Sequence, residues 1–210
     1  MARSANYMDT GKTSIVYSNI HLYRVVLNLL YAGTYRSRFE DVTRHLSGRV
    51  SVLELCFGDI WVAKYCRERG IAWTGFDINE SFVRSACKKG YNAFCTDVSS
   101  MDALPKNDIT VIQGSLYHFH EEMSSLLAKI FASTDALLVS EPVRNISSSG
   151  GAIGWLARRS ADAGKGHEHF RYDADSLQAL AAKQAPKFGC SYSVVGRKRD
   201  MTILFERPGN

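Results

Sequence analysis

Apolar residues recur at helical spacing near the amino terminus. They predict one helix over residues 15–30, which Gly33 can end, and a second over residues 36–46, before Gly48. We therefore expect residues 1–48 to form a helical cover over one compact domain of residues 49–210.

From residue 50 onward, short apolar runs alternate with amphipathic stretches, several of which end at a glycine. The stretches predict helices at 60–69, 80–89, 119–132 and 173–182. The apolar runs predict buried strands at 50–55, 72–78, 92–98, 108–113 and 136–140, and two alternating segments predict an antiparallel hairpin at 191–197 and 201–207. This alternation indicates an α/β fold, a three-layer sandwich whose mostly parallel seven-stranded sheet has helices on both faces.

Composition narrows the class of protein. The 210 residues are 45% hydrophobic and 22% charged, which is globular, and no apolar run is long enough to span a membrane. The five cysteines form no CxxC pair and the N-terminus has no apolar signal region, so we expect reduced thiols, no bound metal and a cytoplasmic location. The net charge of +5 is spread along the chain, and its densest cluster, at 197–199, is interpreted as a solvated turn. No nucleic-acid partner is expected.

Polar residues follow the predicted parallel strands, whose carboxyl ends share one edge of the sheet. The first strand contains Glu54 and runs into a turn at Gly58, where a glycine allows close backbone approach to a ligand. The second strand ends at Asp77, whose carboxylate can accept both hydroxyls of a ribose, and the third ends near Asp97. The fourth runs into Gln113, Gly114 and Ser115. Ligands of such sheets bind at this edge.

Each carboxylate also has a purely structural interpretation. Glu54 can be tied to backbone amides inside the domain, Asp77 can cap the helix that follows it, and Asp97 can be a turn residue. Their joint occurrence at successive strands favours a binding site.

These residues and their order resemble the class I S-adenosylmethionine-dependent methyltransferases, from about Val50 to Arg207. The resemblance implies S-adenosylmethionine as the cofactor, with the methionine part against Gly58, the ribose hydroxyls on Asp77 and the adenine against Ile78. It also implies that Asp97 and Val98 meet the adenine edge, and that the methyl-donor end is bordered by Gln113, Gly114 and Ser115; Glu54 belongs to the same cofactor-binding set. One departure stands out, because Cys56 and Ile60 replace the outer glycines of the family's acidic-x-Gly-x-Gly-x-Gly pattern.

A long connection between the fifth strand and the next helix, residues 141–172, is expected to close over the acceptor as a lid. His118 follows the fourth strand and is the first candidate for a catalytic base. Further candidates for this role are His167, His169 and Glu141. Aromatic and basic residues of the cover that could reach the cofactor are Tyr17, Tyr23, Tyr31, Tyr35, Arg36 and Arg38.

The resulting hypothesis is an enzyme that transfers a methyl group from S-adenosylmethionine to an oxygen or nitrogen of a small molecule, such as a metabolite, a sugar or a lipid-linked sugar. A nicotinamide-dependent oxidoreductase on a related fold is the second hypothesis, although Ile60 would crowd a pyrophosphate at the glycine turn. A binding protein with a degenerate cofactor turn is the third. The acceptor and the oligomeric state stay open.

Overall fold

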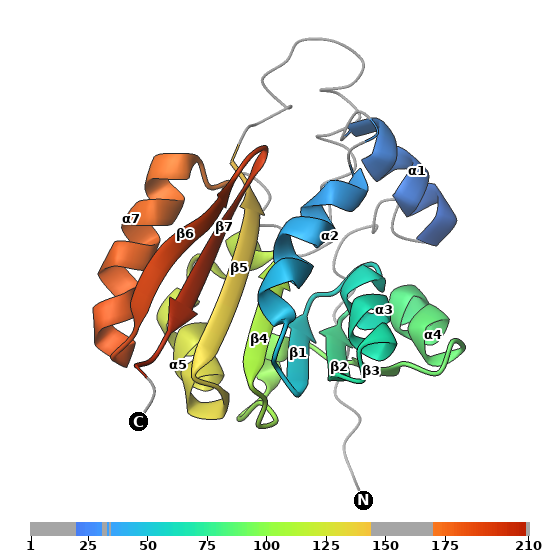
Figure 1. Ribbon diagram of the computed structural model, residues 1–210, viewed down its shortest axis with the longest axis horizontal. Coiled ribbons are helices and arrows are strands. Elements are labelled where there is room, and N and C mark those ends of the chain that lie inside the picture. Colours follow the sequence, from blue (N-terminus) through green and yellow to red (C-terminus); the bar gives the residue numbers. More distant parts are fainter. Residues whose placement is uncertain (1–19, 31–32, 34, 144–169, 209–210) are drawn as a thin grey trace, which may run out of the picture.

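A computed structural model describes residues 20–30, 33, 35–143 and 170–208 of the chain. Seven strands lie side by side in one sheet, in the order β3-β2-β1-β4-β5-β7-β6 (Figure 1). The first five strands are parallel, while β7 runs antiparallel to both β5 and β6. The strands are β1 Ser51–Leu55, β2 Ala72–Asp77, β3 Asn92–Cys95, β4 Ile109–Gln113, β5 Ala136–Pro142, β6 Ser191–Arg197 and β7 Asp200–Glu206. The predicted α/β sheet with its C-terminal hairpin is confirmed.

Helices cover both faces of this sheet. The α-helices are α1 Ile20–Leu30, α2 Tyr35–Thr43, α3 Trp61–Glu68, α4 Glu80–Cys87, α5 Met123–Ser133 and α7 Ala174–Gln184. Short 3₁₀ helices are η2 Arg44–Leu46, η3 Val98–Ser100, η4 Leu116–Phe119 and η6 Ala185–Phe188. Figure 1 shows α3 and α4 beside β2 and β3, and α7 beside the β6–β7 hairpin.

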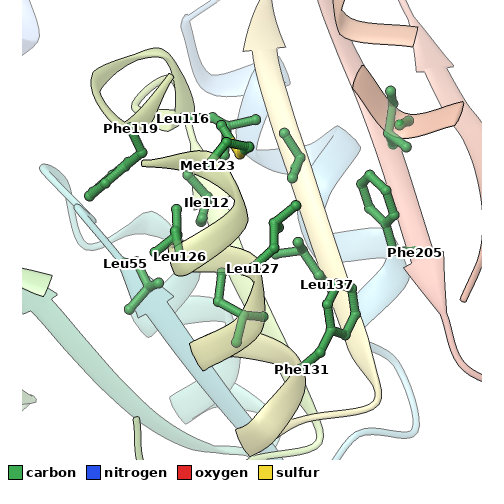
Figure 2. Packing of buried hydrophobic residues seen from close by; sticks show 14 of the residues in the cluster. Leu55, Ile112, Leu116, Phe119, Met123, Leu126, Leu127, Phe131, Leu137 and Phe205 are labelled. Carbon is green, nitrogen blue, oxygen red and sulfur yellow. The ribbon is translucent and has the colours of Figure 1, made fainter. Parts of the chain in front are cut away.

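Two hydrophobic clusters, one on each face, form the core. The first joins α1–α4 to the sheet and includes Val42, Leu46 and Val62. The second joins η4, α5 and α7 to the opposite face; in it, α5 packs Leu127 and Phe131 against the sheet (Figure 2). The cover of residues 1–48 therefore contributes, through α1 and α2, to the same core as the sheet.

The bounds differ from the predicted ones at three places near the carboxyl edge of the sheet. Strand β3 ends at Cys95 instead of residue 98, because the Asp97 side chain accepts the Ser99 N–H and starts η3. The helix predicted from residue 119 begins at Met123, after η4. Strand β5 continues to Pro142, so Glu141 lies within a strand and not in a connection.

Helix α1 begins at Ile20, and the predicted first turns of this helix, residues 15–19, lie outside the described residues. No helix in the described parts of the chain combines the length and apolar character needed to cross a membrane.

Candidate functional site

The turn after β1 keeps the backbone shape of a glycine turn with a single glycine. Gly58 has a φ of 55°, and Cys56, at the position of the first family glycine, has a φ of 54°. A left-handed conformation is unfavourable for a residue with a side chain. It is held here by the Cys56 N–H, which donates to the Phe76 carbonyl at 2.7 Å. Cys56 therefore adopts a backbone conformation that usually favours glycine.

The two side chains that replace glycines are buried to different extents. Ile60 is 4% exposed and belongs to the cluster between the sheet and α1–α4. Cys56 packs partly buried against the cluster on the opposite face. Ile60 therefore lies in the core and not at the sheet edge, whereas Cys56 is half-buried next to the turn.

Asp77 lies between the glycine turn and the start of α4. One carboxylate oxygen accepts the Gly58 N–H at 2.9 Å and the other accepts the Asn79 N–H at 2.8 Å. Burial raises the pKa of Asp77 to about 6, although these two amides oppose the rise. A carboxylate has about four lone-pair positions, so both oxygens can still accept a hydroxyl each. Helix α4 is capped by the Asn79 side chain, which accepts the Ser81 and Phe82 N–H groups, so the interpretation of Asp77 as the cap of this helix is wrong.

The other residues that the sequence assigns to the nucleoside differ in how exposed they are to solvent. Ile78 is 40% exposed, one of the few large apolar side chains of the described chain that is open to solvent. Asp97 caps η3, as its turn interpretation holds. Val98 is 2% exposed and packs in the cluster that contains α5, so its side chain is not available to a ligand.

Glu54 points into the core and not to the sheet edge. Its side chain accepts a hydrogen bond from the Trp73 indole N–H at 2.8 Å and is 1% exposed. Burial raises the pKa of Glu54 well above its ordinary value, and the charges of Asp59 and Asp77 add to the rise. Gly75 makes room for this arrangement, since a β-carbon there would lie 2.2 Å from the Trp73 ring. This geometry argues against direct contact between the Glu54 carboxyl group and a ligand.

Folding should therefore take up a proton at Glu54, which gives a testable pH dependence. The unfolded carboxyl group ionises near pH 4.3 and the folded one much higher, so stability from this group is present below that pH and falls as pH rises. We expect Glu54→Gln, which keeps an acceptor for Trp73, to gain stability over the native protein by about 1.4 kcal/mol per pH unit above pH 5. Urea unfolding at several pH values measures the difference. If the free energy of unfolding changed with pH in the same way in both proteins, the raised pKa of Glu54 would be contradicted. Asp77 titrates in both proteins, so its contribution cancels in the difference between them.

The end of β4 meets the N-terminal cover. Gln113 donates from its side-chain amide to the Arg38 carbonyl at 3.1 Å, and its side-chain oxygen is buried without a hydrogen-bond partner. Gly114 has a φ of 67°, and a β-carbon there would lie 2.7 Å from the Arg38 guanidinium. Helix α2 thus places Arg38 directly on the turn that the sequence assigns to the methyl-donor end.

Glu141 holds the same turn from the opposite side. One of its carboxylate oxygens accepts the N–H groups of Ser115 and Leu116, both at 2.7 Å. The residue is 1% exposed, and burial raises the pKa of Glu141 to about 7, against the lowering effect of the two amides and Arg38. Arg38 in turn forms an ion pair with Asp200 of β7, 3.0 Å long. The Glu141 carboxylate is therefore bound to backbone amides, which favours a structural role for Glu141 over a role as the catalytic base.

His118 lies on η4, half-buried, with its ring centre 4.0 Å from that of Tyr117. The residues after the long connection fold back onto this segment: Phe170 stacks on His120 at 4.5 Å, and the Arg171 guanidinium lies 3.7 Å from the centre of the Tyr117 ring. Residues 170 and 171 thus contact η4 and the residue that follows it. Most of the expected lid lies outside the described residues, as do two of the other candidate bases, His167 and His169.

Sequence reasoning missed an ion pair that ties α1 to the cofactor turn. Arg24 donates to both oxygens of Asp59, at 2.8 and 2.6 Å, and Asp59 also accepts the Ile60 N–H at 2.7 Å. The Asp59 side chain is completely buried. The hydrogen bonds from Arg24 to this carboxylate raise the pKa of Arg24. A polar position on the otherwise apolar face of residues 15–30 was the available signal, but no pattern links it to residue 59.

The cover residues proposed as cofactor contacts are only partly described. Tyr35 is buried against Phe39, and Arg36 lies on the surface, near Glu40 and over the Trp61 ring. Nothing is described for the side chains of Tyr17, Tyr23 and Tyr31. Within the described residues, no group of three or more His, Cys, Asp or Glu is placed to hold a metal ion.

A cavity of about 570 Å³ lies at the opposite, amino edge of the sheet. Its lining residues are Arg49, Ser51, Lys106, Asn107, Asp108, Phe131, Ala132, Ser133, Thr134, Asp135 and Arg207. Its polar groups bind the protein itself: Asp108 accepts the Ser51 amide and hydroxyl, and Lys106 donates to a carbonyl at the end of α5. We therefore place the candidate site at the carboxyl edge.

Comparison with known proteins gives similarity in structure only. No protein-family model matches the chain, and no curated protein matches its sequence. Solved structures do match. The plantazolicin methyltransferase BpumL in complex with SAH is 16% identical, with a TM-score of 0.66 over 92% of this chain and 93% of that one. Human N-acetylserotonin methyltransferase in complex with SAM is 17% identical, with a TM-score of 0.60 over 92% and 58% of the two chains.

A third match is the mitomycin 7-O-methyltransferase MmcR, 13% identical with a TM-score of 0.61, over 92% of this chain and 60% of that one. The chain thus spans nearly all of BpumL but little more than half of the other two enzymes. The resemblance in fold to class I methyltransferases is confirmed.

Proposed function

We propose that this protein binds S-adenosylmethionine at the carboxyl edge of its sheet and transfers the methyl group to an oxygen or nitrogen of a small molecule. The observation that carries the proposal is the position of Asp77. Its buried carboxylate is held against the Gly58 amide, next to the exposed Ile78 side chain, in a fold shared with methyltransferases. A carboxylate next to a glycine turn and an exposed apolar side chain supports the proposal that a nucleoside binds here.

The residues present fit the cofactor. Asp77 would accept the ribose hydroxyls, Ile78 would cover the adenine, and the adenine edge would meet Asp97 and the backbone of Val98. The side chain of Ile60 packs into the core, so it does not occupy the turn that would receive the methionine part. Gln113, Gly114 and Ser115 would border the methyl-donor end. The cofactor supplies a methyl group that its sulfonium already activates, and the protein aligns the acceptor and excludes water.

His118 is the candidate general base for an acceptor that must lose a proton. It is half-buried on η4, directly after the turn that borders the methyl-donor end. We expect His118→Ala to lower kcat for methyl transfer by a factor of about 10²–10⁴ while affinity for S-adenosylhomocysteine stays unchanged. Transfer of a radiolabelled methyl group to the acceptor measures kcat, and calorimetry measures affinity. Full turnover by the variant would remove His118 from the mechanism.

The acceptor class is proposed as a metabolite, a sugar or a lipid-linked sugar. Support comes from the similar structures. These include enzymes named for N-acetylserotonin and for position 7-O of mitomycin, and structures of BpumL with desmethylPZN analogues.

Titration calorimetry of the full chain tests the proposal. We expect S-adenosylhomocysteine to bind in the micromolar range and NAD⁺ and NADP⁺ not to bind. Tighter binding of NAD⁺ or NADP⁺ than of S-adenosylhomocysteine would contradict the methyltransferase proposal and favour the oxidoreductase hypothesis. Absence of binding to all of these ligands would favour a binding protein that has lost its cofactor.

A further inference from the structure

Three charged residues meet where the carboxyl end of β5 lies beside the amino end of the antiparallel strand β7. They are Arg38 from α2, Glu141 from β5 and Asp200 from β7, here called the edge cluster. Side chains in it are almost completely buried: Arg38 is 9% exposed, Asp200 is 7% exposed and residue Glu141 is 1% exposed. The edge cluster therefore contains two carboxyl groups and one guanidinium out of water.

Charge in the edge cluster is unbalanced when both carboxyl groups are ionised. Arg38 pairs with Asp200 at 3.0 Å, which leaves Glu141 with backbone partners, the amides of Ser115 and Leu116. Among the described residues, the charges that act on Glu141 are Arg38, which favours its ionised form, and Asp200, which opposes it. Tyr172 also faces Glu141, but burial and this carboxylate raise the pKa of Tyr172 to about 12, so it stays neutral.

Glu141, which carries the uncompensated charge, is bound to the turn after β4 that would meet the methyl donor. Glu141 is hydrogen-bonded directly to the Ser115 amide, and Arg38 lies against Gly114. A positive charge bound at this turn would favour the ionised form of Glu141, and by reciprocity ionised Glu141 would favour the positive ligand. A neutral ligand of the same shape would have neither effect.

We propose that the edge cluster selects a positively charged ligand, so that S-adenosylmethionine, with its sulfonium, displaces a proton from Glu141 to the solvent on binding, whereas S-adenosylhomocysteine, with its neutral sulfur, does not. The inference rests on the proposed function for the position of the ligand. It gives Glu141 a positioning and selecting role, in which the product is held less tightly than the methyl donor.

The test is calorimetry of both ligands with the full chain at pH 7, in two buffers of different ionisation enthalpy, which reports the protons released. Because Glu141 titrates near pH 7 in the free protein, S-adenosylmethionine should release up to about half a proton more than S-adenosylhomocysteine. Glu141→Gln keeps an oxygen for the two amides but cannot titrate, so the difference should vanish. Glu122→Gln, which changes an exposed carboxyl group at the start of α5, should behave as the native protein.

The affinity ratio of the two ligands gives a second readout. If the sulfonium lowers the Glu141 pKa from about 7 to about 6, the preference for S-adenosylmethionine should rise about fivefold between pH 6 and pH 8 in the native protein and stay constant in Glu141→Gln. Titration of the ligands themselves and of Asp77 occurs in both proteins and cancels.

Each outcome decides between the two proposals. If both ligands bind the native protein with equal proton release, the charge selection is wrong and the proposed function stands; this result needs no variant. If neither ligand binds, the proposed function is wrong and the selection falls with it.

Discussion

Asp77→Asn is expected to lower the affinity for S-adenosylhomocysteine by about a hundredfold. The native carboxylate can accept both ribose hydroxyls, and a hydrogen bond to a charged group contributes about 1.5–3 kcal/mol. Asparagine has one acceptor oxygen, and this oxygen is needed by the Gly58 or Asn79 amide. Loss of about 2.7 kcal/mol corresponds to a hundredfold change in Kd. Calorimetry measures the affinity, and a thermal melt shows that the variant is folded.

Asp173→Asn is a matched control for this result. Asp173 caps α7 by accepting the Ser176 N–H, so the exchange again removes a carboxylate that binds a backbone amide, but on a helix that supplies no residue of the candidate site. Its affinity for S-adenosylhomocysteine should equal that of the native protein. Equal affinities for Asp77→Asn and the native protein would restrict Asp77 to a structural role.

Arg24→Ala is expected to lower the free energy of unfolding by about 3–5 kcal/mol. The substitution leaves the Asp59 carboxylate completely buried without its guanidinium, and an unpaired buried charge is strongly destabilising. It also releases α1 from the turn after β1. Urea unfolding followed by circular dichroism measures the effect.

Two further variants separate the buried pair from surface effects. Arg84→Ala removes a surface ion pair between Arg84, which is 62% exposed, and Glu80, which is 73% exposed. It should change the free energy of unfolding by no more than about 0.5 kcal/mol. Arg24→Ala combined with Asp59→Ala should be more stable than Arg24→Ala alone, because the double variant leaves no unpaired charge at this position. A loss below 1 kcal/mol for Arg24→Ala would mean that solvent reaches Asp59.

The pattern of apolar residues predicted the sheet because its central parallel strands are buried as nearly continuous apolar runs. In β4 and β5, for example, Val111, Ile112 and Leu138 are 0% exposed, and a parallel sheet covered on both faces requires such runs. Asp77 and Gly58 could be placed from the sequence because the carboxyl ends of neighbouring parallel strands share one edge. Local chemistry near that edge was less predictable: Asp97 shortens β3, and Glu54 turns inward to Trp73.

The two ion pairs of the site could not be predicted. Arg24 and Asp59 are separated by 35 positions, and Arg38 meets Asp200 only because β7 lies between β5 and β6. Such contacts depend on tertiary packing of a helix end against a strand end, which leaves no spacing pattern in the chain. The same holds for Glu141, whose interpretation changed once β5 was found to include it.

The place of β7 in the sheet also orders events during synthesis. β7 pairs with β5 and carries Asp200, so the nascent chain exposes the β5 edge and leaves Arg38 without this partner until residues 200–206 have left the ribosome. Contacts between α2 and the β6–β7 turn, such as that of Asp41 with Lys198, span 157 positions. The parallel strands β1 to β4 can pair early, but the cluster of Arg38, Glu141 and Asp200 is completed only when translation of β7 is finished.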